Sequence, residues 1–332
     1  MKAWILSFIL AGALALHHSY LEAQQPAKIP RIGYVSGTGT ATDQGPYVEA
    51  LRQGLRELGH TEGKTYVIEY RGAEGQIERV PSLVEELVQT KVDLLVAPVP
   101  GAIGTAKQAT KTIPIVMVTG VDPVTNGFVE SLAHPGGNLT GISTLTQDLN
   151  AKRLELLMEV VPRLSRIGIL LDPSGPTSNS SLTNLREYEN AAKLLNLNVQ
   201  SLEVRGPKPD LEPIFKTAVK LKVAALITIT NANLFMQQKR LAELAIKNKL
   251  PTMFHGSTWV DSGGLMSYST DEMSAFRRAA TFIDKILKGT KPADLPVEQT
   301  TKFEFVINIK TAKQIGLNIP QSLLFRADRV VK

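Results

Sequence analysis

The 332-residue chain contains no cysteine. This absence excludes a disulfide framework, zinc sites with thiolate ligands, iron–sulfur clusters and thiol nucleophiles. Aromatic residues make up only 6% of the chain, and 37 Lys and Arg stand against 31 Asp and Glu. Because this excess of positive charge is mild and no basic run is interleaved with aromatics, we predict no nucleic-acid partner. The 43% of hydrophobic residues is typical of a globular protein, and the length fits two domains.

Motifs for catalysis, cofactors and metals are also scarce. Beyond the N-terminal segment the only histidines are His60, His134 and His255, and their spacing fits no metal site. The sequence has no Gly-x-Ser-x-Gly nucleophile motif. Gly37-Thr-Gly39 begins like a dinucleotide-binding motif, but Thr42 stands where the third glycine is needed. We therefore predict that the protein is not an enzyme and binds no cofactor or metal.

The one long hydrophobic run lies at the N-terminus. Lys2 precedes the apolar residues 4–16, which are too few to span a bilayer core of about 30 Å but suit a secretory signal. Leu21-Glu22-Ala23 fits a cleavage site, so we predict a signal peptide over residues 1–23; an uncleaved anchor is the alternative. Without a cysteine at that site the protein has no lipid anchor, and we expect export to a periplasm.

Short apolar runs alternate with amphipathic stretches from Arg31 onward, a pattern typical of βαβ units and a largely parallel sheet. In the first half, we predict strands at 31–36, 65–70, 92–97 and 113–118 and helices at 47–58, 80–89 and 101–110. In the second half, we predict strands at 167–172, 199–204, 224–230 and 252–255 and helices at 151–161, 182–195, 211–220 and 234–248.

The two halves also repeat each other in sequence. Arg31-Ile-Gly recurs as Arg166-Ile-Gly, and Gly136-Gly137 before a short apolar run recurs as Gly263-Gly264. Such an internal repeat predicts an α/β protein made of two doubly wound Rossmann-like lobes. A cleft between similar lobes is a common binding site for small molecules, and hinge closure over the ligand is a common motion.

The motifs that identify a family lie along the whole chain after the predicted signal. They are residues 109–116 (Ala-Thr-Lys-Thr-Ile-Pro-Ile-Val), 120–124 (Gly-Val-Asp-Pro-Val), 134–143 (His-Pro-Gly-Gly-Asn-Leu-Thr-Gly-Ile-Ser), 263–265 (Gly-Gly-Leu) and 316–320 (Gly-Leu-Asn-Ile-Pro). In these residues the chain resembles the substrate-binding proteins of ABC importers with the type I periplasmic-binding fold. It is most similar to the family that includes aromatic amino-acid (tryptophan) binding proteins.

The resemblance implies a hinge of about three chain crossings, near Ser143, Ser267 and Val297. The lobes expected from it are residues 30–143 plus 268–297 for the first and residues 144–267 plus 298–332 for the second.

Ligands of open α/β sheets bind beyond the carboxyl ends of the strands, where helix N-termini direct backbone N–H groups at anions. The loops after the predicted strands therefore supply the candidate ligand-binding residues. In the first lobe they are Ser36, Gly37, Pro100, Gly101, Ala102 and Asp122, and in the second Asp172, Thr177, Asn179, Asn231, Asn233, Ser257 and Trp259.

An amino-acid ligand would find a partner for each of its groups among these residues. The helix beginning at Gly101 would hold its carboxylate, Asp122 would face its ammonium group, and Trp259 would stack on its side chain. Each side chain also has a structural alternative: turn formation for Asp122 and Asp172, helix capping for Asn231 and Asn233, and lobe packing for Trp259.

The chain departs from the aromatic-binding family at two places. Val99 precedes the proline at 100, where those members carry a hydroxyl residue. They also carry Asp-Asn-Thr where this chain has Thr230-Asn231-Ala232, so a carboxylate that would hold an ammonium group is missing. The loss of a charged partner from a buried site would weaken binding of the same ligand. A different and less cationic ligand is therefore compatible with the sequence.

The function that we predict is that of an extracytoplasmic receptor. It would close over a small molecule, either an amino acid or a related compound, and present it to the permease and ATPase subunits of an ABC importer. A periplasmic ligand sensor that partners a membrane signalling receptor is the alternative.

Overall fold

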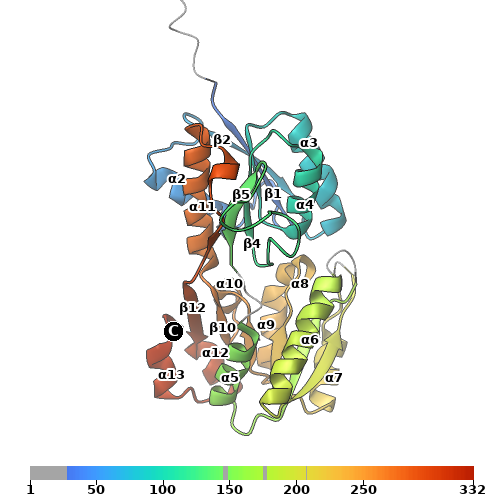
Figure 1. Ribbon diagram of the computed structural model, residues 1–332. Helices are drawn as coiled ribbons and strands as arrows, with labels where there is room; N and C mark the ends of the chain where they lie inside the picture. The colour runs from blue at the N-terminus through green and yellow to red at the C-terminus, as the bar shows by residue number, and fades with distance from the viewer. Residues whose placement is uncertain (1–27, 145–148, 175–177, 207) are drawn as a thin grey trace, which may run out of the picture.

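The computed structural model describes residues 28–144, 149–174, 178–206 and 208–332. The predicted signal peptide over residues 1–23 lies outside the described residues. Two sheets, each covered by helices, form two lobes stacked one above the other (Figure 1). None of the helices in the described ranges is long and apolar enough to cross a membrane.

The first sheet contains six strands in the order β11-β5-β4-β3-β1-β2. Its strands are β1 (Arg31–Ser36), β2 (Val67–Gly72), β3 (Leu94–Ala97), β4 (Ile115–Thr119), β5 (Leu139–Ser143) and β11 (Glu298–Gln299). Its helices are α2 (Pro46–Glu57), α3 (Val80–Gln89), α4 (Pro100–Ala109) and α11 (Glu272–Leu287). Helices α2 and α11 pack on one face and α3 and α4 on the other, because successive strand side chains point to opposite faces.

The second sheet contains seven strands in the order β13-β12-β10-β9-β8-β6-β7. Its strands are β6 (Arg166–Leu171), β7 (Asn198–Glu203), β8 (Ala225–Thr228), β9 (Thr252–Phe254), β10 (Met266–Thr270), β12 (Phe303–Asn308) and β13 (Arg329–Val331). Its helices are α5 (Asn150–Val160), α6 (Ser178–Leu194), α7 (Glu212–Lys220), α8 (Ala232–Met236), α9 (Gln238–Lys247), α10 (Ser257–Asp261), α12 (Ile309–Ile315) and α13 (Gln321–Arg326).

The repeat seen in the sequence is present in the topology. The order β2-β1-β3-β4-β5 in the first sheet matches β7-β6-β8-β9-β10 in the second, and these neighbours pair in parallel. Each sheet buries apolar side chains on both faces. The predicted architecture of two doubly wound α/β lobes is confirmed.

Among the described elements, consecutive ones belong to different lobes at three places. Strand β5 belongs to the first sheet, whereas α5 packs against α6 and β10 of the second. Strand β10 ends at Thr270 in the second sheet, and α11 then packs on α2 in the first. Strand β11 pairs with β5 and the next strand, β12, pairs with β10. Residues 268–270 thus belong to the second sheet and 298–299 to the first, because both strands keep pairing beyond the crossings expected from sequence.

Two helical segments differ from the sequence prediction. The single helix predicted over 234–248 is divided into α8 and α9 at Gln237, whose φ of −105° leaves the helical range. The segment after His255, which we expected to be a loop, contains the short helix α10. Both α8 and α10 follow the carboxyl end of a parallel strand, so both stand at the edge of the sheet where ligands bind.

Candidate ligand-binding site

Loops from the two lobes meet at the carboxyl ends of the strands. A Cβ atom placed on Gly37, which follows β1, would lie 3.9 Å from the Cβ of Ala232 at the start of α8. A Cβ placed on Gly75 would lie 3.5 Å from Oδ1 of Asn233. The two lobes are therefore in contact across the region where the sequence predicts the cleft.

The two departures from the aromatic-binding family lie together in this contact. The same Cβ position on Gly37 is 3.4 Å from Cγ1 of Val99 in the first lobe and 3.0 Å from Cδ1 of Ile77. Val99 and Ala232 therefore approach Gly37 from opposite lobes. The apolar side chains of Val99 and Ala232 thus both lie beside Gly37, where the two lobes meet.

Four candidate residues of the first lobe lie in two places: Pro100, Gly101 and Ala102 begin α4, and Asp122 lies in the turn after β4. Pro100 and Gly101 are exposed at the start of α4, and Ala102 is buried. No side chain caps α4, so its first N–H groups have no side-chain partner among the described residues. The Asp122 carboxylate accepts hydrogen bonds from the N–H groups of Val124 and Thr125, at 2.8 and 3.0 Å, and so holds its own turn.

Ser36 and Gly37 lie at the end of β1. The Ser36 hydroxyl accepts a hydrogen bond from the N–H of Thr38 at 3.1 Å. The carbonyl of Gly37 accepts one from the N–H of Gly75 at 2.9 Å. These bonds hold the loop after β1 against the loop after β2 and fix the surface that faces α8.

In the second lobe, three candidate side chains have local structural partners. Asp172, 2% exposed, accepts hydrogen bonds from the backbone N–H and the hydroxyl of Ser174. Asn231 caps α8 by accepting from the N–H of Leu234 at 2.9 Å. Trp259, also 2% exposed, stacks on Phe254 with ring centroids 4.8 Å apart.

The other candidates of the second lobe either form no side-chain hydrogen bond within the described part of the chain or lie outside the described residues. Oδ1 of Asn233 is buried and has no hydrogen-bond partner among the described residues. Ser257 is the first residue of α10 and is half-buried. Thr177 and the side chain of Asn179 lie outside the described residues.

A buried polar network beneath this edge of the second sheet was missed by sequence reasoning. The Arg153 guanidinium is 0% exposed and donates to the carbonyl of Tyr268 at 2.7 Å and to Oδ1 of Asn150 at 2.9 Å. The Tyr188 hydroxyl lies 3.1 Å from Nε2 of His255. Burial, aided by the charge of Arg153, lowers the pKa of His255 well below its usual value, so the imidazole is neutral at pH 7.

A second missed group joins Tyr47 of α2 to Glu272 of α11. The Tyr47 hydroxyl donates a hydrogen bond to the Glu272 carboxylate, and its ring stacks on Phe276 with centroids 4.8 Å apart. The same ring lies 6.4 Å from the ring of Phe235 in the second lobe. Burial raises the pKa of Glu272, while the hydrogen bond from Tyr47 opposes that shift. A carboxyl group of the first lobe therefore stands beside the second lobe.

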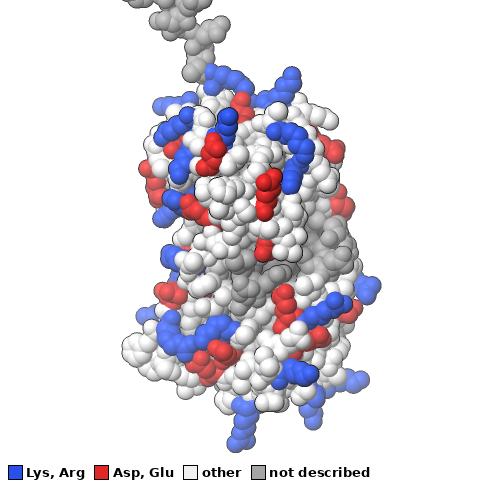
Figure 2. Space-filling model, viewed as in Figure 1, with Lys and Arg blue, Asp and Glu red and all other residues white. Residues whose placement is uncertain are grey.

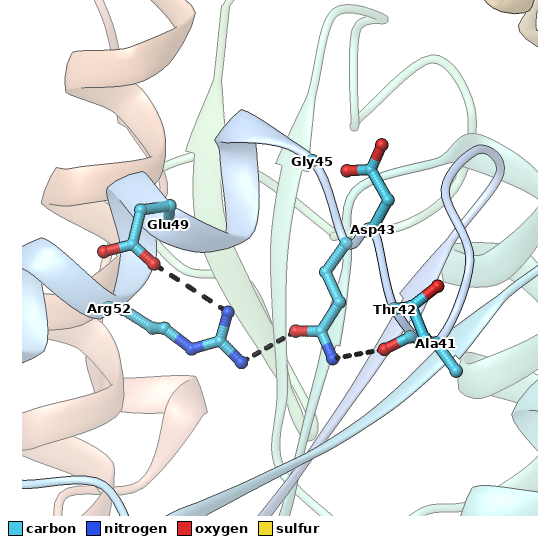
Figure 3. A pocket seen from close by; sticks show the side chains of 7 residues that line it. Ala41, Thr42, Asp43, Gly45, Glu49 and Arg52 are labelled. Carbon is cyan, nitrogen blue, oxygen red and sulfur yellow. Dashed lines mark hydrogen bonds and ion pairs between the residues drawn. The ribbon is translucent and has the colours of Figure 1, made fainter.

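A separate hollow lies on the first lobe alone (Figure 3). Its volume is about 360 Å³, and it is lined by residues 41–45 with Glu49 and Arg52. Arg52 donates to Gln44 at 2.7 Å and forms ion pairs with Glu49 and Glu62. Because the one cation of the hollow is already paired with two carboxylates, we assign no ligand to it.

Charged side chains are scattered over both lobes on the face seen in Figure 2, without a broad patch of one sign. Within the described ranges, no group of three or more His, Asp or Glu could hold a metal ion. The groups brought together between the lobes are thus hydroxyls, amides, aromatic rings and one carboxylate, which suits recognition of a small polar molecule.

Comparison with known proteins finds relatives that bind amino acids. The chain is 28% identical to a tyrosine-binding protein of Clostridioides difficile over 264 residues, which are 79% of this chain and 74% of that protein. It is 26% identical to a Streptococcus pneumonia ABC domain solved in complex with L-Trp, with a TM-score of 0.79 over 91% of this chain and 99% of the other.

A conserved domain protein of Vibrio cholerae shares the fold, with 24% identity and a TM-score of 0.80 over 91% of this chain and 100% of that one. These overlaps confirm the two-lobed fold expected of a type I periplasmic binding protein. Residues 41–331, most of the chain, match the family described as ABC transporter substrate binding protein. The chain therefore belongs to the family of ABC transporter substrate-binding proteins.

Proposed function

We propose that this protein is a periplasmic receptor that binds an amino acid or a related small molecule between its lobes and delivers it to an ABC importer. The observation that carries the proposal is the contact of Gly37 with Ala232, which brings the carboxyl-end loops of the two sheets together. A ligand that contacts both lobes favours the closed form and shifts the population toward it. The permease and ATPase subunits of the importer would read that shift.

Two relatives support an amino acid as the ligand, since one is named for binding tyrosine and the other was solved with L-Trp. In our proposal, the exposed N–H groups at Gly101 hold the ligand carboxylate, because the start of α4 carries a partial positive charge. Asn233 of the other lobe accepts a hydrogen bond from the ligand through its amide oxygen, which has no hydrogen-bond partner in the part of the chain that the structure describes. The remaining contacts that we propose are Ser36, Gly37, Pro100, Ala102, Asp122, Asp172, Thr177, Asn179, Asn231, Ser257 and Trp259.

The family and the N-terminal sequence support a proposal for the location. Receptors of ABC importers work outside the cytoplasm, and residues 1–23 have the composition of a signal peptide. We therefore propose that the mature chain begins at Gln24 and acts in the periplasm.

Thermal unfolding of residues 24–332 tests the proposal. The panel contains amino acids, short peptides, purines, sugars and small carboxylates. A ligand at 100 times its dissociation constant adds about 2.7 kcal/mol to the free energy of unfolding, which gives a clear rise in melting temperature. A rise with an amino acid supports the proposed ligand class, a rise with another compound supports the receptor with a different ligand, and no rise with any compound contradicts the proposal.

A further inference from the structure

Glu272 is a carboxylate of the first lobe that faces the second. It is the first residue of α11, directly after the crossing that follows β10. Its Oε2 atom lies 3.6 Å from the position that a Cβ atom on Gly256 would occupy, just after β9 in the second lobe. Gly256 belongs to a loop at the carboxyl end of the second sheet, so Glu272 stands at the edge where a ligand would bind.

Glu272 differs from the other acidic side chains that sequence reasoning placed in the cleft. The carboxylates of Asp122 and Asp172 each accept two hydrogen bonds through Oδ1, all of them from their own turns, so their position serves the local backbone. Glu272 accepts one hydrogen bond, from the Tyr47 hydroxyl, and forms no ion pair with any described residue. Because Tyr47 bonds to Oε2, the other carboxylate oxygen has no hydrogen-bond donor among the described residues.

The surroundings of Glu272 leave its charge partly uncompensated. Burial raises its pKa, the buried Arg153 of α5 favours the ionised form from a distance, and Glu304 of β12 disfavours it. A partly buried carboxylate with one hydrogen bond has lost more hydration than its protein partner returns. A protonated amine placed against the carboxylate oxygen that does not bond to Tyr47 would donate a charge-assisted hydrogen bond to it and offset the lost hydration.

We propose that Glu272 receives the protonated nitrogen of the ligand, and that it thereby selects, within the ligand class proposed above, the molecules that carry a cationic amine. This inference rests on the proposed function. It also resolves the loss of the carboxylate in the Thr230-Asn231-Ala232 segment, because Glu272 supplies the charge from the hinge side of the cleft.

The structural alternative is that Glu272 only ties α11 to Tyr47 of α2. Two substitutions separate the roles. Glu272→Gln removes the charge but keeps an oxygen that accepts the Tyr47 hydrogen bond, whereas Tyr47→Phe removes the hydrogen bond and keeps the charge. Glu49→Gln is the matched control, because Glu49 is an exposed carboxylate on α2 that pairs with Arg56.

The test measures calorimetric binding of three probes to the mature chain, residues 24–332. The probes are L-tyrosine, tyramine, which has the amine without the carboxylate, and hydroxyphenylpropionate, which has the carboxylate without the amine. We expect the wild type to bind the deaminated acid at least tenfold more weakly than L-tyrosine. Glu272→Gln should weaken both amine probes at least tenfold and leave the deaminated acid unchanged, while Glu49→Gln should change none of the three.

Several results would overturn the inference. One is a Glu272→Gln variant that binds L-tyrosine as tightly as the wild type. A second is a Glu272→Gln variant that binds all three probes more weakly by the same factor. Another needs no variant: wild-type protein that binds the deaminated acid as tightly as L-tyrosine has no site for the amine. Wild-type protein that binds no amine but binds a sugar or a carboxylate of the panel refutes the role of Glu272 and keeps the receptor. Protein that binds nothing in the panel refutes both.

Discussion

The contact between Gly37 and Ala232 predicts that a disulfide will form between the lobes. The natural chain has no cysteine, so Gly37→Cys combined with Ala232→Cys introduces only two thiols. The two Cβ positions are 3.9 Å apart, and disulfides bridge Cβ separations of about 3.5–4.5 Å. The new Cβ at position 37 also meets the end of the Ile77 side chain at 3.0 Å, and a small rotation of that side chain makes room.

The expected gain in stability follows from the length of the closed loop. Linking positions 37 and 232 closes a loop of roughly 200 residues, which in the chain-entropy model stabilises the folded state by about 5 kcal/mol at 25 °C. The oxidised double variant should therefore melt at a higher temperature than the reduced one, and reductant should abolish the difference. Thiol titration before and after mild oxidation reports bond formation, and each single variant is the control.

The reasoning is refuted by one pattern of results. If both single variants form disulfide-linked dimers on oxidation, their thiols are accessible. If the double variant then keeps its two thiols or forms only dimers, the loop after β1 and helix α8 are not in contact in solution. A ligand that stabilises the closed form should accelerate formation of the bond within one chain.

Two further predictions concern the first lobe. Gly54→Ala should lower the free energy of unfolding by about 1–3 kcal/mol, because its Cβ would clash with the backbone carbonyl oxygen of Arg277 on α11 and lie 2.8 Å from the Cβ of Ala280. Gly104→Ala is the control: its Cβ meets no atom within 4 Å, and the change should raise the free energy of unfolding by up to about 1 kcal/mol through helix propensity. Equal urea midpoints for the two variants would contradict the close crossing of α2 and α11. Asp284 titrates below its usual pKa because Lys288 and His60 outweigh the opposing effect of burial. Its ion pairs thus stabilise the fold above the unfolded pKa of about 4, and this stability is lost as the pH falls through the folded pKa. At pH 7 the Asp284→Asn variant should therefore melt at a lower temperature than the wild type, and this difference should shrink in acid. A difference that stays constant down to about pH 2 would disprove the contribution of these ion pairs.

The doubly wound fold could be predicted because its strands are buried on both faces. Leu94–Ala97 and Ala225–Thr228 are nearly continuous apolar runs, as parallel strands between two helical layers require. The repeat of Arg31-Ile-Gly at Arg166 then related the halves. Periodicity could not show the break at Gln237, because the buried residues Leu234 and Leu241 are seven apart and keep helical spacing across it.

The missed polar groups have a physical reason in common. Tyr47 and Glu272 are far apart in the sequence and meet only because the chain crosses back to the first lobe after β10. Arg153 lies in a helix with charged neighbours, so its sequence context is that of a surface arginine. Its burial is possible because the Tyr268 carbonyl of β10 and the Asn150 amide oxygen, one turn earlier in α5, accept its hydrogen bonds.

A polar residue after a strand is a weak predictor of ligand contact, because turns and helix ends need the same residues. Asp122 and Asn231 each satisfy backbone N–H groups through one oxygen, so their presence after a strand is explained without a ligand. Glu272 follows a crossing, so it lies beside the hinge, where displacement is smallest when the lobes open. A ligand amine held there would be bound by the first lobe before α8 and α10 of the second cover it. Under this order of events, charge selects the ligand, and the packing of Ala232 against the loop at Gly37 holds the lobes closed.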